Sequence, residues 1–211
     1  PLTDPRVKVY CPNFSPYHTR TLALAVGWLG LHPGALVPLD RTQLDKGLQH
    51  TSGRECLPLP ICIGQLLQIH EHRQPGEIAG FYMLQGGAPC VSDAYMGYFE
   101  RFLTEQRLTD LFLFNPKPDN GFLGFDKFFL AQHLSPAIIL ADILVEIDHV
   151  LRVVGHQGAL DQLRDEWERF ALWARSLDEF HATLPAFVER LAHLPRTKDP
   201  RTCPRVVVAG D

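Results

Sequence analysis

The first 116 residues repeat one pattern, in which a short apolar run is followed by a turn and then by a stretch with the periodicity of an amphipathic helix. The apolar runs lie at residues 7–10, 35–39, 78–84 and 111–114. The helical stretches lie at residues 17–30, 40–49, 60–73 and 93–106. Such alternation is typical of βαβ units, because parallel strands need a crossover connection. The sequence therefore predicts an α/β fold, with a parallel sheet and flanking helices.

Local signals support the predicted helix starts. Asp40 can cap the second helix, and Ser92 or Asp93 can cap the fourth. Pro60 suits the first turn of the third helix, because an amide at that position would have no partner within the helix. The residues at 115–124 are rich in Pro, Gly, Asn and Asp, which predicts a surface loop.

Beyond this loop the sequence predicts long helices at residues 127–154, 160–176 and 177–193, the first with a break near Ser135-Pro136. Two stripes at helical spacing are expected to be buried. They are Leu163, Trp167, Phe170 and Trp173, and Phe180, Leu184, Phe187 and Leu191.

This organisation suggests three parts. Residues 1–124 form an α/β domain that carries most of the cysteines, and residues 125–204 form a helical region. Residues 205–211, Arg-Val-Val-Val-Ala-Gly-Asp, have the character of a strand that runs into a tight turn. We expect them to be the first strand of a second, truncated α/β unit, and therefore expect the chain to be a fragment of a longer protein.

Composition narrows the classes of partner. A formal net charge of −4 and a pI near 6.2 leave no basic stripe for a phosphate backbone, so no nucleic-acid partner is expected. No apolar run approaches the roughly 20 residues that span a bilayer. The first residues, Pro-Leu-Thr-Asp-Pro-Arg, lack the pattern of a signal peptide. A cytoplasmic protein without a membrane partner is expected.

The five cysteines have neither the spacing of a disulfide framework nor a CxxC pair, and are better interpreted as thiols or metal ligands. Two of them, Cys56 and Cys90, lie in loops just ahead of predicted helices. In a parallel α/β fold such loops meet at one edge of the sheet. The helix dipole there favours the thiolate, which is the form that binds iron. Both cysteines are therefore candidate metal ligands.

The other three cysteines have simpler interpretations. Cys11 ends a predicted strand at the same edge and could supply a third thiolate, although packing is the favoured role. Cys62 lies in an apolar run and is predicted to be a small core residue, whereas Cys203 is predicted to be an exposed linker thiol.

Two further groups resemble metal sites but are expected to be surface features. Asp142, Glu146 and His149 share a helical face with ExxH spacing, but a carboxylate-bridged site needs a second such motif. His70 and His72 lie at the end of a predicted helix, where imidazoles can meet terminal carbonyl groups.

The two cysteine segments resemble those of the 2-hydroxyacyl-CoA dehydratase and benzoyl-CoA reductase family. The first reads Thr51-Ser-Gly-Arg-Glu-Cys-Leu-Pro-Leu and is followed by Gly64-Gln-Leu-Leu, and the second reads Gly86-Gly-Ala-Pro-Cys after Phe81-Tyr-Met. Asp119-Asn-Gly-Phe and the segment at 205–211 fall where this family has a later loop and its next α/β unit. The similarity is greatest to the dehydratase-like part of fused CoA-substrate-specific enzyme activases and to double-cubane-cluster proteins.

The resemblance implies an oxygen-sensitive iron-sulfur cluster, of the [4Fe-4S] or double-cubane type, with Cys56 and Cys90 as ligands. It implies a further ligand, either Cys11 or a residue beyond Asp211. It also implies one-electron transfer, driven by an ATP-hydrolysing activase domain or subunit, to an acyl-CoA-type substrate. The backbone amides around Gly53 and Gly86-Gly87 would tune the potential of the cluster.

Two features depart from the family pattern. Val91-Ser-Asp-Ala-Tyr follows the second cysteine in place of a basic, glycine-containing segment, and no GxxxxGK[ST] motif occurs. Two other classes of function therefore stay open. The chain could be a cysteine-nucleophile enzyme that uses Cys56 or Cys90 with a histidine base, or a non-catalytic module that docks on a partner or forms a homodimer.

Overall fold

The computed structural model describes residues 1–13, 15–35, 40–83 and 94–204. The chain divides into two compact units, Pro1–Ile139 and Leu140–Asp211. Several predictions fall outside the described residues: most of the strand at 35–39, the helix caps Ser92 and Asp93, the ligand Cys90, and the α/β unit at 205–211.

The first unit contains the predicted parallel sheet. Strands β1 (Val7–Tyr10), β2 (Ile78–Tyr82) and β3 (Leu111–Phe114) pair in the order β1-β2-β3, and both pairs are parallel. On its other side, β1 pairs with the segment 32–34. The amide of Val9 donates to the carbonyl of His32, and the amide of Gly34 donates to the carbonyl of Val9, each at 2.8 Å. The α/β class and the parallel arrangement are confirmed.

Helices connect and cover these strands: α1 (Pro16–Trp28), α2 (Arg41–Leu48), α3 (Pro58–His72), α4 (Tyr95–Glu105) and α5 (Lys127–Val154). Asp40 caps α2 as predicted, in a capping box with Gln43. Proline at position 58 opens α3, and Pro60 lies in its first turn. Helix α5 is continuous through Pro136, so the predicted break there is wrong.

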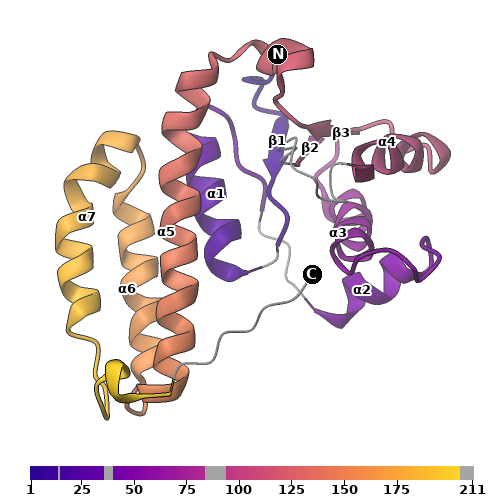
Figure 1. Ribbon diagram of the computed structural model, residues 1–211. Coiled ribbons are helices and arrows are strands. Elements are labelled where there is room, and N and C mark those ends of the chain that lie inside the picture. Colours follow the sequence, from indigo (N-terminus) through magenta and orange to yellow (C-terminus); the bar gives the residue numbers. More distant parts are fainter. Residues whose placement is uncertain (14, 36–39, 84–93, 205–211) are drawn as a thin grey trace. The chain divides into compact units, whose positions relative to one another are not determined.

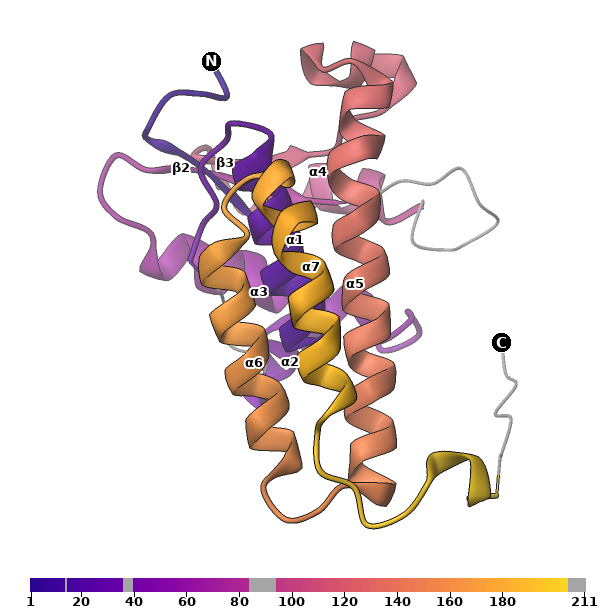
Figure 2. The same ribbon diagram turned by 90° about the vertical axis from the view of Figure 1, so that its left-hand side faces the viewer.

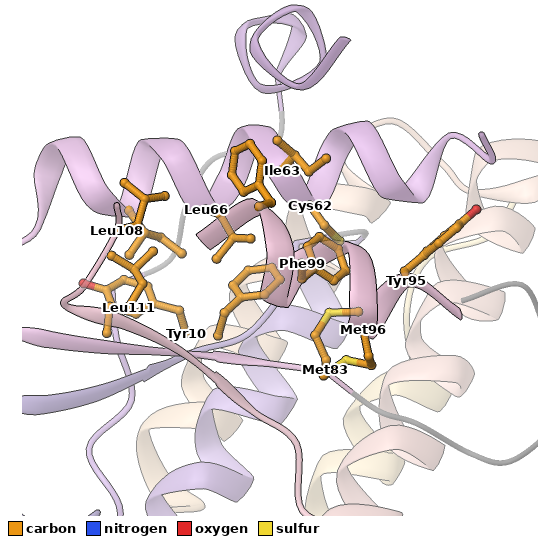
Figure 3. Packing of buried hydrophobic residues seen from close by; sticks show 14 of the residues in the cluster. Tyr10, Cys62, Ile63, Leu66, Met83, Tyr95, Met96, Phe99, Leu108 and Leu111 are labelled. Carbon is orange, nitrogen blue, oxygen red and sulfur yellow. The ribbon is translucent and has the colours of Figure 1, made fainter. Parts of the chain in front are cut away.

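Each face of the sheet packs against its own helices, because side chains alternate along a strand (Figure 1). Tyr10, Phe81 and Leu111 point to the face that α3 and α4 cover, where they contact Ile63, Leu66, Phe99 and others (Figure 3). Val9, Tyr82 and Phe114 point to the opposite face and pack against α1 and the first turns of α5. The unit is therefore a three-layer α/β/α structure.

The backbones of helices α2 and α3 lie very close together where the two helices cross. A Cβ atom on Gly47 would lie 1.7 Å from the carbonyl oxygen of Pro60, and one on Gly64 would lie 1.8 Å from that of Gln43. Only glycine fits at these two positions. Gln43 and Gln65 are fully buried nearby and hydrogen-bonded.

The predicted surface loop at 115–124 contains a short 3-10 segment, Pro118–Gly124, with no buried residue. Gly121, Phe122 and Leu123 have φ values of 58°, 52° and 56°. This left-handed turn departs from a regular 3-10 helix and leads the chain from the sheet into α5.

In the second unit, α6 (Ala159–Trp173) and α7 (Leu177–Ala192) lie side by side (Figure 2). Their contact is built on an aromatic cluster in which Phe170 stacks on Phe187 with ring centroids 4.3 Å apart. Trp167 and Phe180 complete the cluster. Trp173 does not belong to this stripe, since 64% of it is exposed. The buried stripe continues instead at Ala174, which is fully buried, and the prediction of the burial of Trp173 is wrong.

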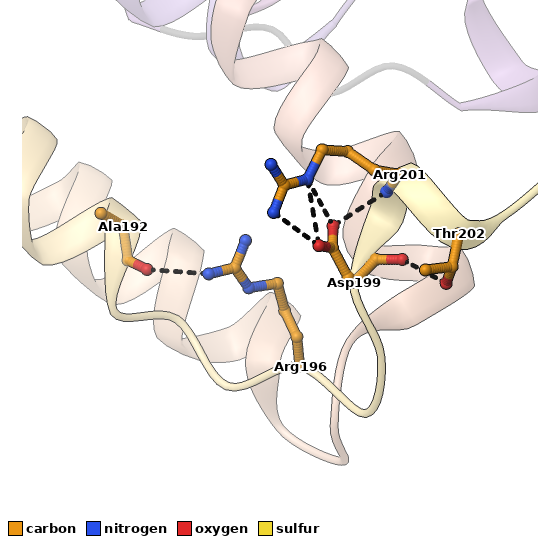
Figure 4. A network of polar contacts seen from close by, with 5 residues as sticks. All are labelled: Ala192, Arg196, Asp199, Arg201 and Thr202. Carbon is orange, nitrogen blue, oxygen red and sulfur yellow. Dashed lines mark hydrogen bonds and ion pairs between the residues drawn. The ribbon is translucent and has the colours of Figure 1, made fainter.

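The segment after α7 returns to the end of α5, where the amide of Thr197 donates to the carbonyl of Val154 at 2.7 Å. Beyond it, the carboxylate of Asp199 accepts hydrogen bonds from the backbone and guanidinium of Arg201 (Figure 4). These bonds lower the pKa of Asp199 to about 2. Across the described residues of both units, the helices fall short of the length and apolar character needed to cross a membrane.

Candidate functional site

The candidate site lies at the carboxyl edge of the sheet, where the chain leaves β1 at Cys11 and β2 at Met83. The first turns of α1, α3 and α4 reach the same edge, because each follows a strand or its loop in a parallel α/β unit. Parallel sheets bind their ligands in the crevice at this edge. The cysteine loop, residues 51–57, belongs to it.

Cys56 lies two residues ahead of α3 and is exposed to solvent, as the prediction of an accessible ligand requires. Its carbonyl accepts a hydrogen bond from the amide of Leu59 at 3.0 Å, which begins the first turn of the helix. Its own amide donates to the hydroxyl of Tyr95, the first residue of α4, at 3.1 Å. The backbone of Cys56 is therefore held between two helix starts while its thiol faces solvent.

Glu55 orders the rest of the cysteine loop. Its carboxylate accepts hydrogen bonds from the amide and hydroxyl of Ser52, at 3.1 Å and 2.9 Å, and from the amide of Arg54 at 3.0 Å. The backbone hydrogen bond from Ser52 is the largest cause of a lowered pKa, about 2, for this carboxyl group. Gly53, with φ of 79°, makes the turn that brings Ser52 and Glu55 together.

Helix α4 holds the loop at a second point. The hydroxyl of Tyr98, one turn after Tyr95, donates to the carbonyl of His50. Burial raises the pKa of Tyr98, so this hydroxyl stays a donor at neutral pH. Tyr95 and Tyr98 are residues of the candidate site that the sequence analysis missed. Their spacing of three residues was a usable signal, because it places both hydroxyls on one side of a helix.

The second predicted ligand, Cys90, lies outside the described residues. Met83 and Ala94 flank the segment that contains it. Met83 lines the carboxyl edge, and Ala94 directly precedes Tyr95. Of the two cysteines predicted to bind a cluster, the structure thus places one.

The remaining cysteines do not share the exposure of Cys56. Cys11 and Cys62 are buried, and burial raises the pKa of each thiol to about 12. Both are protonated at neutral pH, which confirms the packing role predicted for Cys62 and favoured for Cys11. Cys203, predicted to be exposed, is half-buried in the second unit.

Four of the other candidate metal residues, Asp142, Glu146, His149 and His72, are exposed, as predicted. His70 is half-buried, and its Nδ1 atom has no hydrogen-bond partner among the described residues, so the prediction of a surface feature is wrong for it. The ring of His72 contacts the carbonyl of Gln68 at 2.9 Å near the end of α3, in the role expected for a terminal imidazole. Within the described ranges, no three His, Cys, Asp or Glu side chains gather in a way that could hold a metal ion.

An apolar pocket of about 430 Å³ opens beside the cysteine loop at the same edge. Cys62, Met83, Phe99 and Tyr95 are among its lining residues, and the side chains of Cys62 and Phe99 lie close together (Figure 3). Its described lining residues are Pro12, His18, Leu22, Pro58, Cys62, Tyr82, Met83, Tyr95, Phe99 and Ile138. The sequence analysis did not predict this pocket, because its walls come from segments more than 120 residues apart in the chain.

One buried polar group in this wall is unexplained by the protein alone. Tyr82, at the end of β2, is 1% exposed, and its hydroxyl has no hydrogen-bond partner among the described residues. By contrast, the hydroxyl of Tyr10 on β1 donates to Glu77 at 2.5 Å. Buried hydroxyl groups are normally paired, so the environment of Tyr82 is unusual.

Comparisons with known proteins gave no match to a family model, to a curated protein or to a solved structure.

Proposed function

We propose that the unit Pro1–Ile139 is the iron-sulfur-binding part of an ATP-dependent, low-potential reductase or dehydratase-like system, with Cys56 and Cys90 as cluster ligands. The observation that carries the proposal is the position of Cys56. Its thiol is exposed just ahead of α3, and its backbone is fixed by the hydroxyl of Tyr95. The proposal also rests on the resemblance of the two cysteine segments to those of the dehydratase family.

The cysteines in the described part of this unit are not equally suited to bind iron. Iron binds the thiolate, and a ligand thiol must be accessible to the metal. Cys56 is exposed to solvent. Cys11 and Cys62 are buried, and burial raises the pKa of both to about 12. A third ligand from Cys11 is therefore not part of the proposal.

A cluster bound at Cys56 and Cys90 would supply one-electron transfer at low potential. The chain's own residues would hold and orient it. Tyr95 fixes the amide of Cys56, and Glu55 already engages the amides of Ser52 and Arg54. A hydrogen bond from these two amides to the cluster would therefore compete with Glu55. This competition makes Glu55 a candidate for adjusting the potential.

The partners follow from the same resemblance. An ATP-hydrolysing activase domain or subunit would deliver the electron, and an acyl-CoA-type molecule would receive it. A homodimer belongs to the same proposal.

The test is iron and sulfide analysis with a visible spectrum, on protein prepared and reconstituted without oxygen. Wild-type protein should bind stoichiometric iron and sulfide. Cys56→Ser and Cys90→Ser should lose most of both while keeping the far-ultraviolet circular dichroism of the wild type. Cys203→Ser is the matched control, since it makes the same change in the other unit and should retain the cluster.

Full iron content in both Cys56→Ser and Cys90→Ser would show that the ligand assignment is wrong. Protein that stays free of iron after reconstitution would point instead to one of the two other functions, a cysteine-nucleophile enzyme or a non-catalytic docking module. In that case, rapid alkylation of Cys56 by iodoacetamide at neutral pH would favour a nucleophilic cysteine, and slow alkylation would favour a docking module.

A further inference from the structure

The loop at residues 196–201, which follows α7 in the second unit, forms a concave and positively charged surface. Its six residues line a pocket of about 550 Å³, a volume within the range of small-molecule pockets, roughly 300 to 1,000 Å³. The loop carries three cations and one carboxylate, which gives it a net charge of +2, whereas the whole chain has a formal net charge of −4. This local charge attracts anions to the pocket.

The backbone of the loop is fixed on both sides of the pocket. The amide and the hydroxyl of Thr197 both donate to the carbonyl of Val154 at the end of α5, at 2.7 Å and 3.0 Å. At the other side, the amide and the hydroxyl of Thr202 donate to the carbonyl of Asp199, at 3.0 Å and 2.7 Å. A fixed backbone lowers the cost of ordering the loop when a ligand binds.

Two of the cations are also held by contacts within the protein. The Nη2 atom of Arg196 donates to the carbonyl of Ala192 at 3.2 Å (Figure 4). The Nε and Nη2 atoms of Arg201 donate to the carboxylate of Asp199, at 3.0 Å and 2.7 Å. Because a guanidinium group has five N–H donors, these contacts leave donors on both arginines for a ligand.

The charge and the donors of the loop fit a phosphate monoester. Such a group carries nearly two negative charges at neutral pH and has three strong acceptor oxygens. The planar fork of an arginine matches these oxygens, and a lysine adds a compact positive charge. A carboxylate or a phosphodiester has one negative charge and would leave part of the charge of the loop uncompensated.

We propose that the loop at residues 196–201 binds the terminal phosphate of a small molecule, with Arg196, Lys198 and Arg201 as its cationic contacts. Asp199 is a positioning residue, because it holds the guanidinium group of Arg201 at the pocket. The proposal goes beyond the cluster site and does not depend on it, since its residues all belong to the second unit.

Methyl phosphate and dimethyl phosphate test the proposal, because they share a phosphate group but carry about two charges and one charge. Their affinities can be measured at about pH 7.5 and low salt by NMR titration of the amide and arginine N–H signals of the 211-residue chain. Wild-type protein should bind methyl phosphate about three- to tenfold more tightly than dimethyl phosphate. The largest changes in chemical shift should fall on residues 196–201.

Arg196→Gln and Lys198→Gln should each weaken the binding of methyl phosphate about two- to fivefold, and the double variant should lose the preference for it. Arg175→Gln is the matched control, because it removes one charge from an exposed arginine at the opposite end of α7 and should leave both affinities unchanged.

Equal affinity of the two probes for wild-type protein would overturn the proposal, as would an equal loss of affinity in Arg175→Gln. Absence of shifts at residues 196–201 would also overturn it. Tight binding of a DNA duplex without a preference between the two probes would assign the loop to a nucleic-acid backbone instead, because that backbone consists of phosphodiesters.

Discussion

The side-chain amide of Gln65 makes two hydrogen bonds with the backbone of Asn13, one as acceptor and one as donor. Its Oε1 accepts from the amide of Asn13 at 3.0 Å, and its Nε2 donates to the carbonyl of Asn13 at 2.9 Å. Gln65 is fully buried in α3, whereas Asn13 lies in the loop between β1 and α1. This pair fixes the path of the chain where it leaves the sheet at the candidate site.

Replacement of Gln65 by leucine should therefore lower the free energy of unfolding by about 1–3 kcal/mol, because two backbone groups lose their partners. Gln132→Leu on the exposed side of α5 is the matched control and should change it by less than about 0.5 kcal/mol. Urea denaturation measures both. Equal effects of the two substitutions would contradict the structural role given to Gln65.

The two strand tyrosines should respond in opposite ways to loss of their hydroxyls. Tyr10→Phe removes a hydrogen bond to the carboxylate of Glu77 and should cost about 1.5–3 kcal/mol. Tyr82→Phe removes a buried hydroxyl with no partner among the described residues, and should leave the ligand-free protein equally stable or more stable by about 1 kcal/mol. The midpoints of urea denaturation test this order, and a larger loss in Tyr82→Phe would show that its hydroxyl is paired.

Two helical glycines offer a similar contrast. Gly64→Ala would place a Cβ 1.8 Å from the carbonyl oxygen of Gln43, so α2 and α3 must separate, at a cost of about 3 kcal/mol or more. Gly97→Ala in α4 meets no atom within 4 Å and should stabilise the protein by about 1 kcal/mol through helix propensity. Thermal unfolding should show a lower midpoint for the first variant and a higher one for the second. A midpoint of thermal unfolding equal to that of the wild type in Gly64→Ala would mean that α2 and α3 do not cross this closely.

Burial of Cys11 and Cys62 predicts a loss of stability at alkaline pH. Each folded pKa is about 12, above the ordinary value near 9, so the folded state holds its proton where the unfolded chain loses it. The stabilisation is complete below about pH 9 and is lost as the pH rises from there towards 12. Between about pH 8 and about pH 10 each thiol should account for roughly 1 kcal/mol of lost unfolding free energy. Cys62→Ala should show a shallower decline than the wild type, and an identical decline would show that the thiol is not shielded.

The elements that the sequence predicted correctly are those with a local cause. Asp40 caps α2 through its own side chain, and the apolar runs of β1 and β3 have no helical period. Pro136 misled the prediction, because a proline inside a long helix costs one hydrogen bond but need not end it. The carbonyl that loses its donor belongs to Gln132, which is exposed and can be hydrated.

The candidate site was predictable only in part for the same reason. The exposed position of Cys56 ahead of a helix follows from the neighbouring sequence. The pocket does not, since it joins His18, Tyr82 and Ile138 from three distant segments. The burial of Trp173 was predicted from periodicity alone, which lets a stripe continue either three or four residues after Phe170 and does not decide between Trp173 and the buried Ala174.

Helix α4 joins the two parts of the candidate site. Tyr95 and Tyr98 bind the cysteine loop at Cys56 and at His50, while Phe99 on the same helix lines the apolar pocket. A rotation of α4 about its own axis would move both attachment points of the loop and one wall of the pocket together. The position of α4 therefore sets both the attachment of the cysteine loop and one wall of the pocket.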